Sequence, residues 1–120
     1  MRSISGRWKL FNAWKPIHVV ERDPLAVCDR VPDEDLVTLQ RSIPGKSLKQ
    51  ERYLIKAGKQ NHNWYFASEQ RPDELLIFTQ YSDKPDRSPA DRVAHACVTL
   101  PGTEDKPARE SIEVRALAVW

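Results

Sequence analysis

The residues best suited to chemistry gather in the last quarter of the chain. His95 precedes a stretch in which Arg109, Ser111, Glu113 and Arg115 occupy alternate positions. Alternate residues of a β-strand point to the same face, so this stretch predicts a strand with one charged face. An imidazole can bind a metal ion, and a guanidinium with a neighbouring hydroxyl can hold a carboxylate through several hydrogen bonds.

The alternating stretch has two interpretations. In the first, Ile112 and Val114 pack into the core and the charged face lies in solvent. In the second, Arg109 and Ser111 form a carboxylate clamp inside the mouth of a β-barrel, where they would hold the distal carboxylate of 2-oxoglutarate. Periodicity alone favours the first.

A metal site of the two-histidine, one-carboxylate type usually leaves a His-x-Asp or His-x-Glu pair on one strand. None of the three histidines fits, because the residues two positions after them are Val20, Trp64 and Cys97. A complete metal site within this chain is therefore not expected. Alone, His95 is typical of a core or edge histidine, His62 of a turn and His18 of the surface.

The aromatic and sulfur-containing residues have simpler interpretations. Trp64 and Tyr65 could line a pocket, but aromatic side chains in strands more often belong to the core, and the same holds for Trp8, Trp14 and Trp120. Cys28 and Cys97 form no CxxC motif, and we expect both to be small buried side chains of a reduced, cytoplasmic protein.

The elements that must position these residues are mostly strands. Trp8, Leu10, Asn12 and Trp14 alternate along the first predicted strand, which ends at Pro16. Acidic residues followed by apolar ones predict one short helix over 32–39. Strands are predicted over 7–14, 24–28, 51–56, 64–67, 74–81, 93–100 and 111–120, with loops over 82–91 and 101–107.

Length and composition agree with one mainly β domain over 1–120, a sandwich or jelly roll of six to eight strands. The net charge is +2, and the 19 basic residues are scattered, which argues against nucleic acid as a partner. No apolar run approaches the roughly 20 residues of a membrane helix. An exposed sheet edge makes a homodimer plausible.

Seven ordered blocks resemble one family. They are Asn-Ala-Trp-Lys-Pro (12–16), Pro-Leu-Ala-Val-Cys-Asp (24–29), His-Asn-Trp-Tyr-Phe (62–66), Asp-Glu-Leu-Leu-Ile (73–77), Tyr-Ser-Asp (81–83), His95 and Arg-Glu-Ser-Ile-Glu-Val-Arg (109–115). From Arg7 to Trp120 the chain resembles the C-terminal half of the AsaB/CmcJ/NvfI hydroxylase/desaturase family. The resemblance implies a partial double-stranded β-helix (jelly roll, cupin-like), Fe(II), 2-oxoglutarate and oxidative tailoring of small secondary metabolites.

The resemblance also implies roles for single residues. His95 matches the family's distal metal histidine. Arg109 and Ser111 match the stretch that binds the co-substrate carboxylate, with Arg115 as a rival. Asn12 and Trp14 match the strand that lines the pocket, to which Tyr65 is added as a lining residue.

The chain also departs from the family. Members are about twice as long, and their His-x-Asp pair lies upstream of the segment that matches Arg7 and Trp8. Lys15 stands where Arg is common, and Ala96 and Cys97 follow the histidine in place of a small or hydroxyl residue and an aromatic. We therefore expect a dioxygenase-family oxidoreductase truncated before its metal pair. The alternatives are a non-catalytic β-domain that binds a small carboxylate or a protein partner, and a fragment that does not fold stably alone.

Overall fold

A computed structural model describes residues 6–45, 47, 49–58, 61–83 and 92–120. The described residues form strands and one short 3₁₀ turn, η1 (Asp33–Asp35). The strands are β1 (Trp8–Pro16), β2 (Leu25–Cys28), β3 (Leu36–Ser42), β4 (Lys49–Ile55), β5 (Trp64–Phe66), β6 (Leu76–Ser82), β7 (Ala94–Cys97) and β8 (Ser111–Val119). The prediction of a mainly β chain is confirmed.

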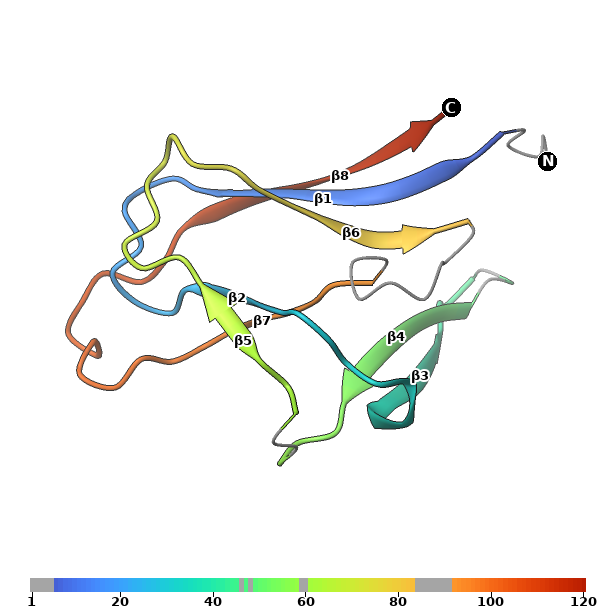
Figure 1. Ribbon diagram of the computed structural model, residues 1–120, viewed down its shortest axis with the longest axis horizontal. Helices are drawn as coiled ribbons and strands as arrows, with labels where there is room; N and C mark the ends of the chain where they lie inside the picture. Colours follow the sequence, from blue (N-terminus) through green and yellow to red (C-terminus); the bar gives the residue numbers. More distant parts are fainter. Residues whose placement is uncertain (1–5, 46, 48, 59–60, 84–91) are drawn as a thin grey trace.

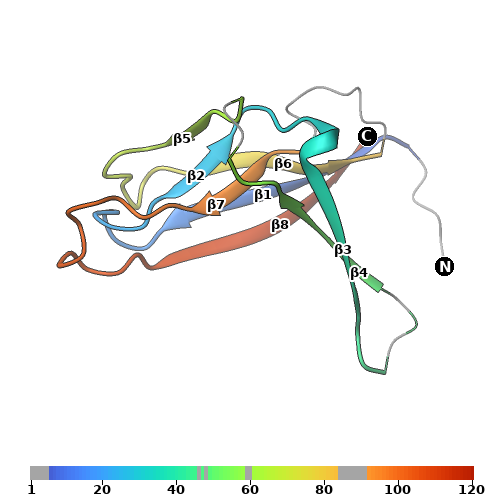
Figure 2. The same cartoon turned by 90° about the horizontal axis from the view of Figure 1, so that it is seen from below.

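The strands build two small sheets and a hairpin. One sheet has the order β6-β1-β8, the other β5-β2-β7, and β3 pairs with β4 alone. All of the pairings are antiparallel. The two three-stranded sheets form two layers, and the β3-β4 hairpin projects away from them (Figures 1 and 2). Any site between the layers therefore draws on strands far apart in the sequence.

Strand β1 is the centre of the first sheet. It pairs with β6 on one side and with β8 on the other, so that Ala13 lies opposite both Ile77 and Val114. Its predicted alternation is confirmed, because Asn12 and Trp14 are buried on one face. Pro16 is its last residue, in keeping with a side chain that removes the backbone donor.

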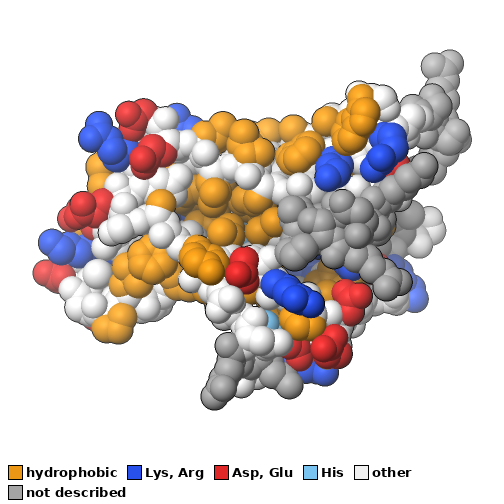
Figure 3. Space-filling view, viewed as in Figure 1, with side chains coloured by type: hydrophobic (Ala, Val, Ile, Leu, Met, Phe, Trp, Pro, Cys, Tyr) orange, Lys and Arg blue, Asp and Glu red, His pale blue; other side chains and the backbone are white. Residues whose placement is uncertain are grey.

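The core is small and lies between the two layers. Its buried members are Trp14, Val20, Leu25 and Phe78, with Val27, Leu76 and Val93 packed against them. Many large apolar side chains stay exposed, as the orange atoms in Figure 3 show. Within the described residues, no helix is long and apolar enough to cross a membrane.

The helix predicted over 32–39 is wrong beyond its first turn. Only Asp33–Asp35 is helical, and β3 begins at Leu36 and pairs with β4 along its whole length. The acidic residues do favour a helical start. However, β-branched Val37 and Thr38 favour a strand, and the cross-strand pairs of the hairpin depend on a partner that the local pattern does not reveal.

Other boundaries shift less. The strand predicted over 93–100 is shorter. The Val98 amide still donates to the Pro24 carbonyl (3.1 Å), but proline has no N–H to donate in return, so the regular pairing of β7 with β2 ends at Cys97. The loop predicted over 82–91 falls mostly on residues 84–91, outside the described residues. Cys28 is buried as expected, whereas the same expectation for Cys97 is wrong, because its side chain is exposed on the edge strand β7.

Candidate functional site

Strand β8 turns its charged face toward the second sheet. In its pairing with β1, Arg115 lies opposite Asn12 and Glu113 opposite Trp14, and these β1 side chains are buried between the layers. All nine residues of β8 are exposed, and the face turned away from the second sheet carries Ile112 and Val114, at 53% and 57%. The interpretation that packs these two residues into the core is therefore wrong. Tertiary pairing, not alternation, decides which face of an amphipathic strand lies inside.

Arg109 and Ser111 contact each other. Arg109 Nη1 donates to Ser111 Oγ (2.9 Å), and Nε donates to the Asp23 carbonyl (2.7 Å). The guanidinium also lies 5.2 Å from the centroid of the Trp14 ring, a cation–π contact. These contacts fix the direction of the fork, and within the described residues its Nη2 group makes no hydrogen bond. That group is available to a carboxylate ligand.

The loop before β8 is tied to the loop before β2. Arg22 Nη1 donates to the carbonyls of Glu104 (3.0 Å) and Lys106 (3.2 Å), and Arg22 also pairs with the Asp23 carboxylate. Asp23 adopts φ 54°, a left-handed conformation in which Asp is enriched among non-glycine residues. Its carbonyl accepts from Arg109. The position of Arg109 therefore depends on Asp23, which lies 86 positions earlier in the sequence.

His95 faces the same space from the opposite sheet. It lies on β7 opposite Val27, and its ring centroid is 4.7 Å from that of Phe78 on β6. Nδ1 is 3.1 Å from the Val93 carbonyl. Because a carbonyl only accepts, Nδ1 carries the hydrogen, and in the neutral ring Nε2 keeps its lone pair. This orientation suits one metal ligand and supplies the outer hydrogen bond that metal-bound histidines usually make.

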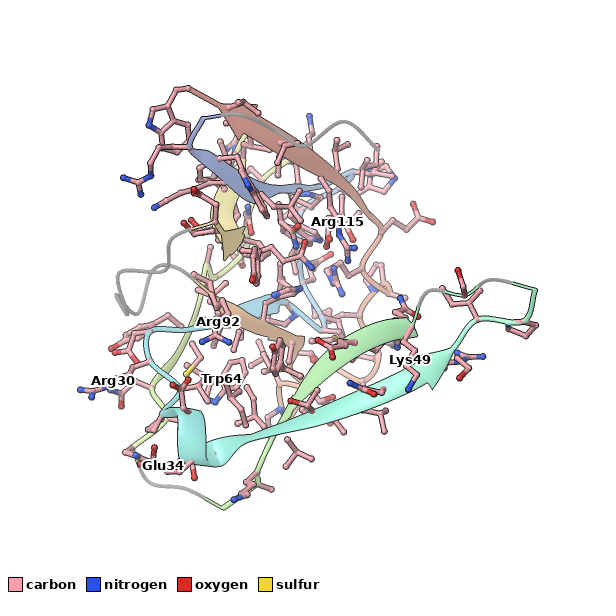
Figure 4. All side chains as sticks on the ribbon, turned by 90° about the vertical axis from the view of Figure 1, so that its right-hand side faces the viewer. Arg30, Glu34, Lys49, Trp64, Arg92 and Arg115 are labelled. Atoms are coloured by element: carbon pink, nitrogen blue, oxygen red, sulfur yellow. The ribbon has the colours of Figure 1, made fainter. Side chains whose placement is uncertain are left out.

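Asn12 lies between these two groups. Its register partners are Phe78 on β6 and Arg115 on β8, and Phe78 contacts His95. The side chain is fully buried, and neither its Nδ2 nor its Oδ1 atom has a hydrogen-bond partner. In Figure 4 the Arg115 side chain lies on the side of β8 that faces the β5-β2-β7 sheet. The structure therefore brings Asn12, Trp14, Arg109, Ser111 and Arg115 onto one face.

Tyr65 shares a face of its sheet with His95, because both lie opposite Val27, but its side chain is largely exposed. It lies on β5 opposite Val27, is 56% exposed, and its hydroxyl donates to Asp29 Oδ2 (3.4 Å). His18 is at the surface as predicted, where it pairs with Glu110 (3.5 Å).

His62 differs from the prediction of a simple turn residue. Its side chain is 6% exposed and its Nε2 lies 3.0 Å from Asp35 Oδ2, whose side chain is 4% exposed. The pair joins the segment before β5 to the base of the β3-β4 hairpin. Local sequence carries no signal for it, because the two residues are 27 positions apart. In the described part of the chain, no three His, Cys, Asp or Glu side chains gather as a metal site.

Comparison with known proteins identifies relatives of this chain. A family model described as "Oxidoreductase/YMDC permease-like domain" matches residues 1–119. The alpha-ketoglutarate-dependent dioxygenase phiK of Fungal sp. is 60% identical over 100% of this chain and 44% of its own length. The hydroxylase/desaturase asaB of Aspergillus flavus is 35% identical over 98% of this chain and 57% of its own length.

A solved structure with a similar fold is also found. The iron and alpha-ketoglutarate-dependent endoperoxidase NvfI matches with a TM-score of 0.78 and 31% identity, over 95% of this chain and 43% of NvfI. The two facing antiparallel sheets and the likeness to NvfI define the fold as that of a jelly roll. The chain belongs to this oxidoreductase family, and the resemblance to the AsaB/CmcJ/NvfI hydroxylases and desaturases is confirmed. It spans less than half the length of phiK and NvfI.

Proposed function

We propose that this chain forms the co-substrate side of an Fe(II)- and 2-oxoglutarate-dependent oxygenase site that hydroxylates or desaturates a small secondary metabolite. The observation that carries the proposal is the inward charged face of β8. If apolar burial alone decided its orientation, β8 would turn Ile112 and Val114 inward. Instead, β8 places Arg115 opposite buried Asn12 on β1. Function is the usual reason for a strand to break the hydrophobic pattern.

In this proposal Arg109 and Ser111 bind the distal carboxylate of 2-oxoglutarate. The guanidinium is already oriented by Asp23 and Trp14, so little conformational entropy is lost when the ligand enters. His95 would supply one metal ligand through Nε2, and the remaining ligands would come from outside the described residues. Bound Fe(II) with 2-oxoglutarate would supply the oxidising chemistry with dioxygen.

A second candidate is a β-domain that binds a small carboxylate without catalysis. The placement of the histidines favours it. His18 is exposed and His62 is paired with Asp35, so among the described histidines only His95 lies between the two sheets. One imidazole holds Fe(II) weakly against water. The two candidates share carboxylate binding and differ in metal-dependent turnover.

Calorimetric titration of 2-oxoglutarate into this chain tests the shared step. Arg109→Ala should weaken binding about tenfold or more, since it removes a charge-assisted contact. Arg41→Ala is the matched control, because Arg41 is an exposed arginine of the β3-β4 hairpin. Equal affinity in wild type and Arg109→Ala would overturn the assignment of the clamp. Succinate formation with Fe(II) and dioxygen then separates the oxygenase from the non-catalytic domain.

We also propose a cytoplasmic location and a small-molecule metabolite as substrate. The supporting observation for the location is that Cys28 and Cys97 are both free thiols, as is usual in a reducing compartment. A homodimer is a further proposal, supported by the exposed apolar residues of β8 at the edge of its sheet.

A further inference from the structure

Asn12 is the most anomalous side chain in the described part of the chain. Its relative exposure is 0%, and both atoms of its amide lack a partner. Buried polar groups almost always make hydrogen bonds, and a buried amide without them destabilises the fold. An apolar residue of similar shape would remove that cost. The amide is therefore explained best by a partner that binds to the protein.

The surroundings of Asn12 indicate what that partner is. Its register partner on β8 is Arg115, and side chains directly opposite in an antiparallel pair have Cβ atoms about 5 Å apart. No hydrogen bond or ion pair joins Arg115 to another described residue, although Glu113 lies two positions away on the same face. A guanidinium beside an amide N–H presents several donors at one place, which suits a carboxylate.

The location relative to the other groups is also informative. On one side of Asn12, Phe78 contacts the His95 ring. Two residues along β1, Trp14 lies under the Arg109 guanidinium, and two strand residues span about 7 Å. Asn12 and Arg115 thus lie between the candidate metal histidine and the Arg109 clamp. A ligand with two carboxylates could reach both arginines.

We propose that Asn12 and Arg115 form a second carboxylate-binding pair, separate from Arg109 and Ser111. The inference rests on the proposed function and adds to it a second anchoring point in the same site. Asn12 Oδ1 accepts from the Arg115 guanidinium when the ligand enters, and Nδ2 and the guanidinium then donate to the same carboxylate. That carboxylate belongs either to 2-oxoglutarate or to an acidic substrate.

The variant Asn12→Leu tests the proposal, because it should weaken carboxylate binding without lowering thermal stability. Leucine has a similar branched shape and needs no hydrogen bond, so the thermal midpoint should stay equal or rise. Affinity for the carboxylate should fall about tenfold or more. Ser82→Ala is the matched control: Ser82 is also buried with an unpartnered hydroxyl, but it lies at the far end of β6. It should leave carboxylate affinity unchanged.

Calorimetric titrations with 2-oxoglutarate and with butyrate identify the source of the carboxylate. Weaker 2-oxoglutarate binding by Asn12→Leu and Arg115→Ala assigns the pair to the co-substrate. Unchanged 2-oxoglutarate binding with weaker butyrate binding assigns it to an acidic substrate. If neither affinity changes, the inference is wrong. If the wild-type chain binds butyrate through this pair but not 2-oxoglutarate, the proposed function fails and the inference stands.

Discussion

Replacing Arg109 by methionine gives the sharpest test of the contacts that position the start of β8. Methionine keeps an unbranched stem that can lie on Trp14, but it removes the guanidinium. The variant loses the donation from Nε to the Asp23 carbonyl and from Nη1 to Ser111 Oγ. It also loses the cation–π contact with Trp14. The loop before β2 and the start of β8 are then no longer joined by this side chain.

The expected loss of stability follows from these three contacts. Each hydrogen bond contributes about 1 kcal/mol net, and a partly exposed cation–π contact about 0.5–1 kcal/mol. The free energy of unfolding should therefore fall by about 2.5–3 kcal/mol. With a urea m value of about 2 kcal/mol/M for a domain of this size, the midpoint should move down by about 1–1.5 M.

Urea unfolding followed by tryptophan fluorescence measures this shift, with Trp14 as a buried reporter. Arg41→Met is the control, since Arg41 lies exposed on β3 and its loss should leave the midpoint nearly unchanged. Coincident curves for wild type and Arg109→Met, with equal slopes, would refute the reasoning. Arg109 would then be oriented without contributing to the joint between the two loops.

Three further outcomes are expected. His62→Leu should lower the free energy of unfolding by about 3 kcal/mol, because it removes the imidazole partner of the buried Asp35 carboxylate. Adding Asp35→Leu to the same chain should recover part of this loss. An unchanged thermal midpoint for His62→Leu alone would contradict the prediction. The backbone amide of Asp73 and then the Arg71 guanidinium hold the pKa of the Asp73 carboxyl below its ordinary 3.8. The stabilisation of the fold by the ionised Asp73 carboxyl is therefore present above pH 3.8 and is lost as pH falls through the lowered pKa. Arg71→Ala should raise the pKa of Asp73 measured by NMR titration. Val114→Lys should reduce any concentration-dependent association measured by sedimentation, because Val114 is 57% exposed on the edge strand, and equal association would exclude this face.

Much of the fold could be predicted from local pattern. The alternation along β1 correctly placed Asn12 and Trp14 on one face, and the ends of β1 and β2 follow from proline and aspartate. The helix over 32–39 failed because a hairpin partner overrode an acidic start. Intrinsic preference is weak where a strand finds a partner, and no local pattern reveals that partner.

The candidate site divides in the same way. Residue types and spacing singled out His95, Arg109 and Ser111 as candidates to bind a metal and a carboxylate, and the family resemblance added Arg115. The unpartnered amide of Asn12 could not be recognised as such, because hydrogen-bond satisfaction is a property of the folded surroundings. The same is true of the His62 contact with Asp35, which joins segments 27 residues apart.

By itself the sequence determined which residues alternate and which side chains could do chemistry, because strand periodicity and functional groups are local properties. Only the tertiary structure decided which face of β8 lies inside. That choice depends on β1, which pairs Arg115 with buried Asn12 and leaves Val114 exposed. A shift of one residue in that register would exchange the two faces. The register, and not the alternation, is what places the charges on the face of β1 that carries Asn12 and Trp14.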